Sequence, residues 1–300
     1  MLHFKLLGTA AGGGVPQWNC ACRLCTLARQ RPERVIPRLQ TQAALSSDGK
    51  RWFLINASPD LRFQIEANQE LHPSPDHGPR STPISGIVLT GADLDQILGL
   101  LLLREFQPLT VYATSLVRRV LESNPFFKML LRVPNQLTWI EITPNTPFLL
   151  DEVTCTPIPL PGSLPLYARD FDTGEAGQAS LGLLFESEGR RIAYTPSLPA
   201  ITDQWRARYA LCDAILVDGA FWSDNELNRT NPDAPFARQI GHLPIGGEDG
   251  SIALLRTVTR PRKVFVHINN TNPVLDRESA EYAFVRGAGW EVASDGWRLN

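Results

Sequence analysis

The chain has 300 residues, of which 43% are hydrophobic and 20% charged, and its formal net charge is −2. This length fits one large domain or two small ones, and the composition is that of a globular protein. The near-neutral charge excludes a basic surface for nucleic acid, and the longest apolar stretch, residues 97–103, is too short for insertion into a membrane.

The first half of the chain alternates short apolar runs with turns and amphipathic stretches. Its start lacks the apolar core of a secretory signal, so we expect a cytoplasmic protein. Apolar and β-branched runs predict strands, and the runs that continue past a polar turn predict helices. The predicted strands are residues 4–7, 42–45, 52–56, 84–90 and 109–112, and the predicted helices begin near 59 and cover 94–103 and 115–123.

The second half repeats this pattern less regularly. Strands are predicted at residues 153–158, 180–185, 191–194, 214–218 and 263–268, and a helix at 250–258. Paired strands with intervening helices indicate an α/β fold of two mixed sheets with helices on their outer faces. No low-complexity linker interrupts the chain, so we expect one domain over residues 1–300. The proline- and glycine-containing segment 163–179 is predicted to be a mobile flap beside a site.

Three cysteines crowd into the loop of residues 18–26. Cys20, Cys22 and Cys25 form a C-x-C-x2-C pattern, in which three thiolates can surround one ion. Soft sulfur ligands in a reducing compartment select zinc, and a closed four-coordinate site stabilises structure without doing chemistry. The alternatives are a redox pair or three unrelated cysteines.

Residues 90–100 are the most informative stretch for chemistry. A predicted strand runs into a polar turn and then directly into an apolar helix. The stretch resembles the metallo-β-lactamase motif T-H-x-H-x-D-H-x2-G-L, with Asp95 in place and the three histidine positions taken by Gly91, Asp93 and Gln96. Gln96 offers an oxygen but no imidazole, which predicts weaker binding of a transition metal.

Other ligand-type residues stand at the ends of predicted elements. Asp218 ends one apolar strand, His267 lies at the end of another, and His242 precedes the helix between them. A lone histidine is more often a satisfied polar residue than a ligand. Two histidines and two or three aspartates, each at a strand end or helix start in this order, favour a metal site.

The chain resembles the coenzyme PQQ synthesis protein B family of pyrroloquinoline quinone biosynthesis, over nearly its whole length. This resemblance implies a metallo-β-lactamase fold, a four-layer αββα sandwich of two mixed sheets. The residues that carry it are 7–14, 16–20, 56–60, 90–100, 217–222, 241–245 and 267–273.

The resemblance also implies roles for individual residues. It implies a structural zinc ion on the three cysteines, with Asn270 where a related phosphodiesterase-like family places a fourth ligand. It further implies an active site with a bound metal, for which we consider Fe²⁺. One group of residues would hold the metal and another the substrate. The metal-binding and catalytic group is Asp95, Asp218, His242 and His267, and the substrate-binding group is Gln96, Asp93, Arg104 and Asn269.

The resemblance implies two alternative functions, and the fold that it implies adds a third. The first is an iron-dependent oxygenase that hydroxylates the tyrosine ring of a dipeptide-like, Glu-Tyr-derived precursor. The second is a non-catalytic carrier that helps PQQ or its precursor across the cytoplasmic membrane. The third is a divergent metal-dependent hydrolase, which the small number of available histidines disfavours. Other proteins of the pathway and a second copy of the chain are the expected partners.

Overall fold

The computed structural model describes residues 2–105, 107–171, 177–229 and 231–299. Of the predicted flap, residues 172–176 lie outside this part. The described chain forms two compact units. Unit 1 contains residues 1–7, 42–189 and 296–300, and unit 2 contains residues 8–41 and 190–295. One domain over residues 1–300 stays a prediction.

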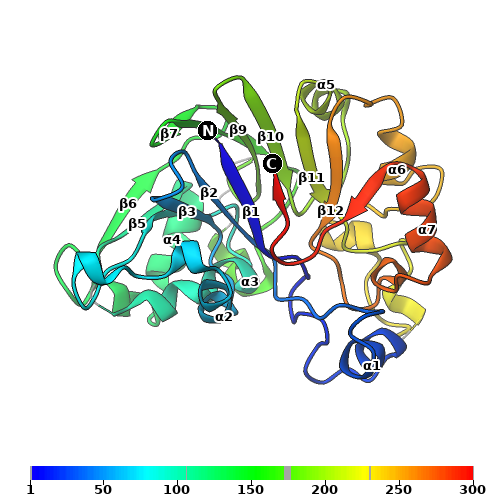
Figure 1. Cartoon of the computed structure of the whole chain (residues 1–300), viewed down its shortest axis with the longest axis horizontal. Coiled ribbons are helices and arrows are strands. Elements are labelled where there is room, and N and C mark those ends of the chain that lie inside the picture. Colours follow the sequence, from blue (N-terminus) through cyan, green and yellow to red (C-terminus); the bar gives the residue numbers. More distant parts are fainter. Residues whose placement is uncertain (1, 106, 172–176, 230, 300) are drawn as a thin grey trace. The chain divides into compact units, whose positions relative to one another are not determined.

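Unit 1 is built on a mixed seven-stranded sheet with the order β14-β1-β2-β3-β4-β5-β6 (Figure 1). β14 pairs antiparallel with β1 and β2 with β3, whereas β3 to β6 run parallel to one another. The strands of this sheet are β1 (His3–Gly8), β2 (Gln42–Ser46), β3 (Trp52–Ile55), β4 (Ile84–Val88), β5 (Leu109–Ala113), β6 (Leu137–Glu141) and β14 (Arg298–Leu299).

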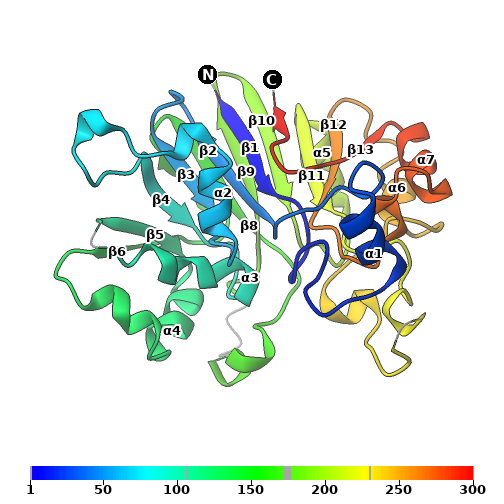
Figure 2. The ribbon, with the colours of Figure 1, turned by 60° about the horizontal axis from the view of Figure 1, so that its bottom comes forward.

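Helices cover one face of this sheet (Figure 2). The buried side of α4 packs against the sheet because its apolar residues recur at helical spacing, and Thr114 caps its start by accepting the Val117 N–H at 3.2 Å. Each fully buried leucine in this core contributes about 1.5–3 kcal/mol. The helical elements of unit 1 are α2 (Leu61–Glu66), α3 (Leu94–Ile97), α4 (Ser115–Ser123), and the 3₁₀ turns η1 (Gln69–Leu71), η2 (Pro75–His77), η3 (Leu98–Leu103), η4 (Phe127–Leu131) and η5 (Leu166–Phe171).

The seven strands β7 to β13 make the second sheet, which is also mixed. Within unit 1, β7, β8 and β9 form an antiparallel meander. Within unit 2, β10, β11, β12 and β13 are all parallel. The bounds are β7 (Phe148–Leu150), β8 (Val153–Pro159), β9 (Leu181–Ser187), β10 (Arg190–Thr195), β11 (Ala214–Asp218), β12 (Arg262–Val266) and β13 (Trp290–Val292).

Parallel strands need crossovers, and unit 2 supplies them as helices. β11 and β12 are buried almost throughout, so their sequences read as apolar runs and not as alternating ones. The helical elements of unit 2 are α1 (Arg23–Gln30), α5 (Asp203–Ala210), α6 (Ser251–Leu254), α7 (Ala280–Gly287), η6 (Leu227–Arg229), η7 (Ala237–Ile240) and η8 (Pro273–Leu275).

Several predicted boundaries differ from the structure: the strand predicted at 84–90 ends at Val88, and the helix predicted at 250–258 covers only Ser251–Leu254. Two further differences have a clear cause. The apolar stretch 94–103 is α-helical only to Ile97 and continues as a 3₁₀ helix, because the backbone of residues 57–58 crosses it where Gly99 leaves room. The Gly99 N–H donates to the Ala57 carbonyl at 2.8 Å. The strand predicted for 263–268 ends at Val266, because His267 adopts a left-handed backbone with φ 57°.

Candidate functional site

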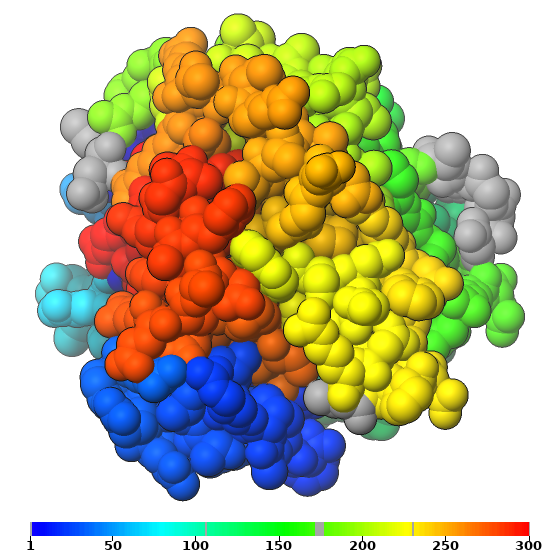
Figure 3. Space-filling view, turned by 90° about the vertical axis from the view of Figure 1, so that its right-hand side faces the viewer, coloured from blue at the N-terminus to red at the C-terminus, as the bar shows by residue number. Residues whose placement is uncertain are grey.

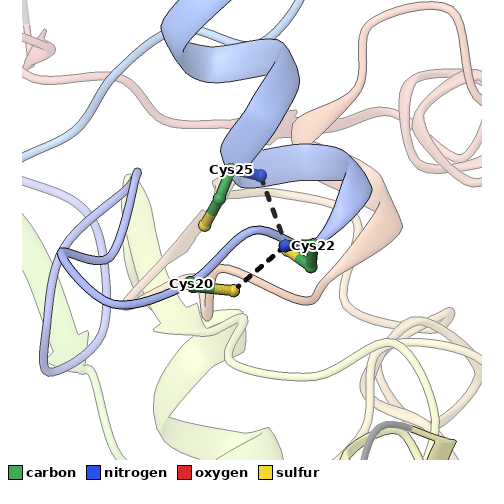
Figure 4. A group of neighbouring side chains, drawn as sticks. All are labelled: Cys20, Cys22 and Cys25. Atoms are coloured by element: carbon green, nitrogen blue, oxygen red, sulfur yellow. Dashed lines mark hydrogen bonds between the residues drawn. The ribbon is translucent and has the colours of Figure 1, made fainter.

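The three cysteines of the 18–26 loop converge in unit 2. The sulfur atoms of Cys20, Cys22 and Cys25 all lie within 4.8 Å of one another (Figure 4). Cys22 caps α1: its sulfur accepts the Cys25 N–H at 3.5 Å, and the Cys20 sulfur accepts the Cys22 N–H at 3.4 Å. Three soft donors this close fit a thiophilic ion such as zinc.

Asn270 completes this group from the loop that follows β12. Its side-chain nitrogen lies 3.3 Å from the sulfur of Cys20, 3.4 Å from that of Cys25 and 4.0 Å from that of Cys22. The structure therefore brings Asn270 beside the cysteines, with its amide nitrogen, a hydrogen-bond donor, toward the sulfurs. Burial raises the pKa of Cys22 to about 11, so an ion bound there has to displace a proton.

The cysteine loop is fastened to the C-terminal part of unit 2 by a buried carboxylate. Asp276 is fully buried and binds the Arg34 guanidinium through both oxygens, at 2.7 and 2.8 Å. Arg23, in the first turn of α1, donates to the same carboxylate. Figure 3 shows the N-terminal segment, in blue, lying against the orange-red segment that contains Asp276.

A second group of ligand-type side chains, also in unit 2, comes from the ends of β11 and β12 and from the loop after η7. Asp218, His242 and His267 each offer a donor atom, and these atoms lie within 4.8 Å of one another. The two imidazoles stack with ring centroids 5.2 Å apart and an interplanar angle of 24°. Phe221 meets the His242 ring edge to face at 5.6 Å. The predicted trio is therefore brought together.

Asp218 orients His242. Its Oδ2 accepts the Leu198 N–H at 3.0 Å and lies 2.8 Å from His242 Nδ1, while Oδ1 accepts the Ala220 N–H at 3.0 Å. An oxygen and an imidazole nitrogen at this distance can both be ligands of one ion.

The backbone presents both histidines from constrained positions. His242 follows Gly241, whose left-handed conformation (φ 87°) ends η7. His267 itself has φ 57°, which is uncommon for a residue with a side chain and occurs most often at functional sites. The Ile268 N–H then donates to the Thr9 carbonyl at 2.9 Å, which holds the strand end after the turn.

The motif of residues 90–100 lies in unit 1. Gly91 leaves a space that Gln96 fills: a Cβ atom added to Gly91 would lie 2.6 Å from Gln96 Oε1. That oxygen is buried and accepts no hydrogen bond from the described residues. Asp93 and Asp95 belong to the start of α3, Asp93 as its N-cap and Asp95 in its first turn.

The remaining predicted substrate-binding residues are Arg104 and Asn269. Arg104, in unit 1, is half exposed and lies 3.5 Å from the Glu105 carboxylate. Asn269, in unit 2, donates from its side chain to Thr271 Oγ1 at 2.6 Å, and Thr271 contacts Glu226 Oε1 at 2.5 Å. Glu226 was not predicted, since nothing in its sequence neighbourhood indicates that an acidic side chain there is buried.

Comparisons with known proteins agree on the fold. Residues 51–268 match the model of the beta-lactamase superfamily domain. The crystal structure of a diphosphatase from the PhnP family superposes with a TM-score of 0.68 at 20% identity, covering 100% of this chain and 98% of that one. The expected fold is thus confirmed, with two mixed seven-stranded sheets flanked by helices.

Closer relatives decide the family. Coenzyme PQQ synthesis protein B from Methylorubrum extorquens (strain PA1) is 41% identical over 309 aligned positions, which cover 100% of both chains. The same protein from Xanthomonas campestris pv. campestris (strain B100) is 40% identical, again with 100% coverage of both chains. The chain belongs to the coenzyme PQQ synthesis protein B family.

Family membership places the chain in pyrroloquinoline quinone biosynthesis. The crystal structure of Zn(2+)-bound PqqB from Methylobacterium extorquens, 42% identical, superposes with a TM-score of 0.92 over 99% of each chain. The family resemblance inferred from the sequence motifs is confirmed.

Proposed function

We propose that the chain is an iron-dependent oxygenase that hydroxylates the tyrosine ring of a dipeptide-like, Glu-Tyr-derived precursor of PQQ. The observation that carries the proposal is the group formed by Asp218 at the end of β11, His267 directly after β12 and His242 after η7. Two imidazoles and one carboxylate are the donor set of non-haem Fe(II) oxygenases, which leaves positions open for O₂ and substrate. When bound, iron would supply O₂ activation for transfer of oxygen to the aromatic ring.

The side chains of the chain itself prepare this centre. The backbone N–H groups of Leu198 and Ala220 hold the Asp218 carboxylate in place, with Oδ2 2.8 Å from His242 Nδ1. His267 is presented from a left-handed backbone and stacked on His242, which restricts both rings. Asp95 and Asp93 remain proposed as a further carboxylate for the same chemistry, and Gln96, Arg104 and Asn269 as substrate contacts.

The cysteine group has a separate proposed role as a structural zinc site. Cys20, Cys22 and Cys25 would supply three thiolates. Asn270 is the proposed fourth ligand, which would bind through its amide oxygen after a half-turn of the side chain. The zinc-bound relative supports this assignment. An ion fully enclosed by such ligands has no open position, so this site stabilises the loop and takes no part in the reaction.

Metal analysis tests the two sites separately. Protein is purified anaerobically, reconstituted with Fe(II) and compared with the triple variant of Cys20, Cys22 and Cys25 to serine. We expect one zinc and one iron per chain in the wild type, loss of only zinc in the triple variant, and loss of only iron in His267→Ala. His77→Ala, which removes an exposed histidine of unit 1, serves as the matched control and should keep both metals.

Activity is measured on the same proteins with the precursor, O₂ and ascorbate, which supplies the two electrons that reduce the second oxygen atom to water. The expected product gains one oxygen atom, and His267→Ala should not form it. Iron retained in His267→Ala, or an unchanged rate in that variant, would contradict the assignment.

A carrier is the second candidate, and the filled space beside Gly91 favours it. Gln96 provides no imidazole where the metallo-β-lactamase motif has one, which leaves unit 1 with fewer metal ligands than that motif supplies. Among the described residues, no helix has the length and apolarity needed to cross a bilayer. A carrier requires no iron, so wild-type protein that holds only cysteine-dependent zinc and binds PQQ would support this function.

A further inference from the structure

A buried carboxylate near the proposed iron centre has no role in the chemistry described so far. Glu226 is 3% exposed and sits between two segments of unit 2. Its Oε2 accepts the Trp222 N–H at 2.7 Å, and its Oε1 lies 2.5 Å from Thr271 Oγ1. Thr271 Oγ1 in turn lies 2.6 Å from Asn269 Nδ2. These contacts form one hydrogen-bond chain, Glu226–Thr271–Asn269.

The direction of this chain follows from proton counting. Thr271 donates its single hydroxyl proton to Glu226 Oε1, as it must wherever the carboxylate is ionised and has no proton to give. The Thr271 oxygen can then only accept from Asn269, which requires the amide nitrogen to face it. The Asn269 carbonyl oxygen is therefore turned away from Thr271, and within the described residues no group donates to it.

Asn269 is also tied to the proposed iron centre. It lies two residues after His267, and its N–H donates to the Ala220 carbonyl at 3.1 Å. The N–H of the same Ala220 donates to Asp218 Oδ1 at 3.0 Å. The side chain of Asn269 is half-buried. Its backbone is hydrogen-bonded to Ala220, the residue whose N–H donates to the Asp218 carboxylate.

We propose that Glu226 is a positioning residue that, through Thr271, holds the Asn269 carbonyl oxygen ready to accept a hydrogen bond from an N–H or O–H group of the substrate. This inference rests on the proposed function, because it assigns one substrate contact at the same centre. The amino group and the phenol of an amino-acid-derived precursor are donors of this class.

Conservative variants test whether Glu226 and Thr271 orient the Asn269 amide or only stabilise the fold. Thr271→Ser keeps the hydroxyl, whereas Thr271→Val keeps the shape and removes it. Glu226→Gln keeps the volume and reverses the polarity: the Trp222 N–H needs the remaining oxygen, so the amide NH₂ faces Thr271 and donates to it. The Thr271 hydroxyl then has to donate to another acceptor. A half-turn of the Asn269 amide would place its oxygen there. Glu248→Gln makes the same substitution at an exposed position and is the control.

The first readout is the side-chain amide of Asn269 by NMR on the zinc-loaded protein at pH 8. Burial raises the pKa of Glu226 to about 7, so the carboxylate is mostly ionised at that pH. We expect slow hydrogen exchange of one Asn269 NH₂ proton in the wild type, Thr271→Ser and Glu248→Gln. Thr271→Val and Glu226→Gln should lose this protection while keeping the backbone spectrum.

The second readout is anaerobic calorimetric titration of the Fe(II)-loaded protein with the dipeptide glutamyl-tyrosine. Loss of one oriented hydrogen bond predicts about tenfold weaker binding in Thr271→Val and Glu226→Gln, with Thr271→Ser within about twofold of the wild type. Iron content should be the same in all variants, because none of them changes a proposed ligand.

The two readouts distinguish failure of the inference from failure of the proposed function. The inference is overturned if the Asn269 NH₂ exchanges as slowly in Thr271→Val as in the wild type. It is also overturned if all variants bind the dipeptide as tightly as the wild type. If the wild type binds no dipeptide while the exchange pattern is as expected, the substrate contact is overturned and the proposed function with it. The orienting role of Glu226 then stands alone.

Discussion

Asp276 holds the cysteine loop of unit 2 in place, and replacing it with asparagine tests how much this attachment contributes. The carboxylate is fully buried and accepts two hydrogen bonds from Arg34, one from Arg23 and one from the Glu278 N–H at 3.1 Å. Asparagine keeps one oxygen but turns an NH₂ group toward guanidinium donors. Two charge-assisted hydrogen bonds are lost, each of which contributes about 1.5–3 kcal/mol.

We expect a loss of about 3 kcal/mol in the free energy of unfolding, less than the full sum because both arginines reach solvent. The sign with pH is fixed by the pKa of Asp276, which Arg34 above all holds well below the ordinary value of 3.8. The carboxylate therefore stabilises the fold above pH 3.8, and this advantage over Asp276→Asn is lost as pH falls through the lowered pKa.

The measurement is urea denaturation of the zinc-loaded protein at pH 7, with zinc affinity from competition with a chromogenic chelator. The loop carries the three cysteines, so we expect zinc affinity to fall about tenfold with the lost attachment. Glu33→Gln is the matched control, because its pair with Arg31 is exposed at both ends and such pairs contribute less than about 1 kcal/mol. If Asp276→Asn costs no more than Glu33→Gln, the structural reasoning fails.

Two further perturbations follow from the buried sites. Burial raises the pKa of Glu226 from 4.5 to about 7, so the fold favours the protonated form, and stability from this group is full below pH 4.5 and lost as pH rises through 7. Urea denaturation at pH 5 and pH 8 measures this. Between these pH values the free energy of unfolding of the wild type should fall by about 3 kcal/mol more than that of Glu226→Gln. An equal change in both proteins would contradict the prediction. Gly91→Ala should cost about 1 kcal/mol because its Cβ meets Gln96 and the Ala179 carbonyl, and the cost should shrink in a Gln96→Ala background. Additive losses in this double-mutant cycle would show that the two side chains do not compete for space.

Much of the sheet framework could be predicted because buried parallel strands produce uninterrupted apolar runs. The strand at 214–218 and the helix at 115–123 appear with the predicted bounds. Helix α5 was not predicted, since its buried residues are only Trp205 and Tyr209 and the rest of its sequence is polar or small. The short strand β6 alternates weakly between exposed and half-buried residues, and its periodicity is correspondingly faint.

Some residues of the candidate site could also be predicted from the sequence, and others could not. Asp218, His242 and His267 could be predicted as a group because carboxylates and imidazoles are common metal ligands and each stands at a strand end or before a helix. The role of Gln96 could not be predicted, since it depends on the space beside Gly91, a feature of backbone packing. Glu226 was missed for a related reason: burial of an acidic residue depends on distant partners, and no local pattern encodes them.

The asparagine-rich loop after β12 explains how one segment can serve both proposed metal sites. Asn270 faces the cysteine sulfurs, Asn269 bonds Thr271, and Asn272 donates to the Gly219 carbonyl at 2.9 Å. Each amide can donate and accept without bringing a charge into buried surroundings. Aspartate at position 269 would place a second carboxylate on the single Thr271 hydroxyl, which has one proton to share. The neutral amide is therefore the side chain that suits each of these positions, and the run of asparagines follows from the bonding each one makes.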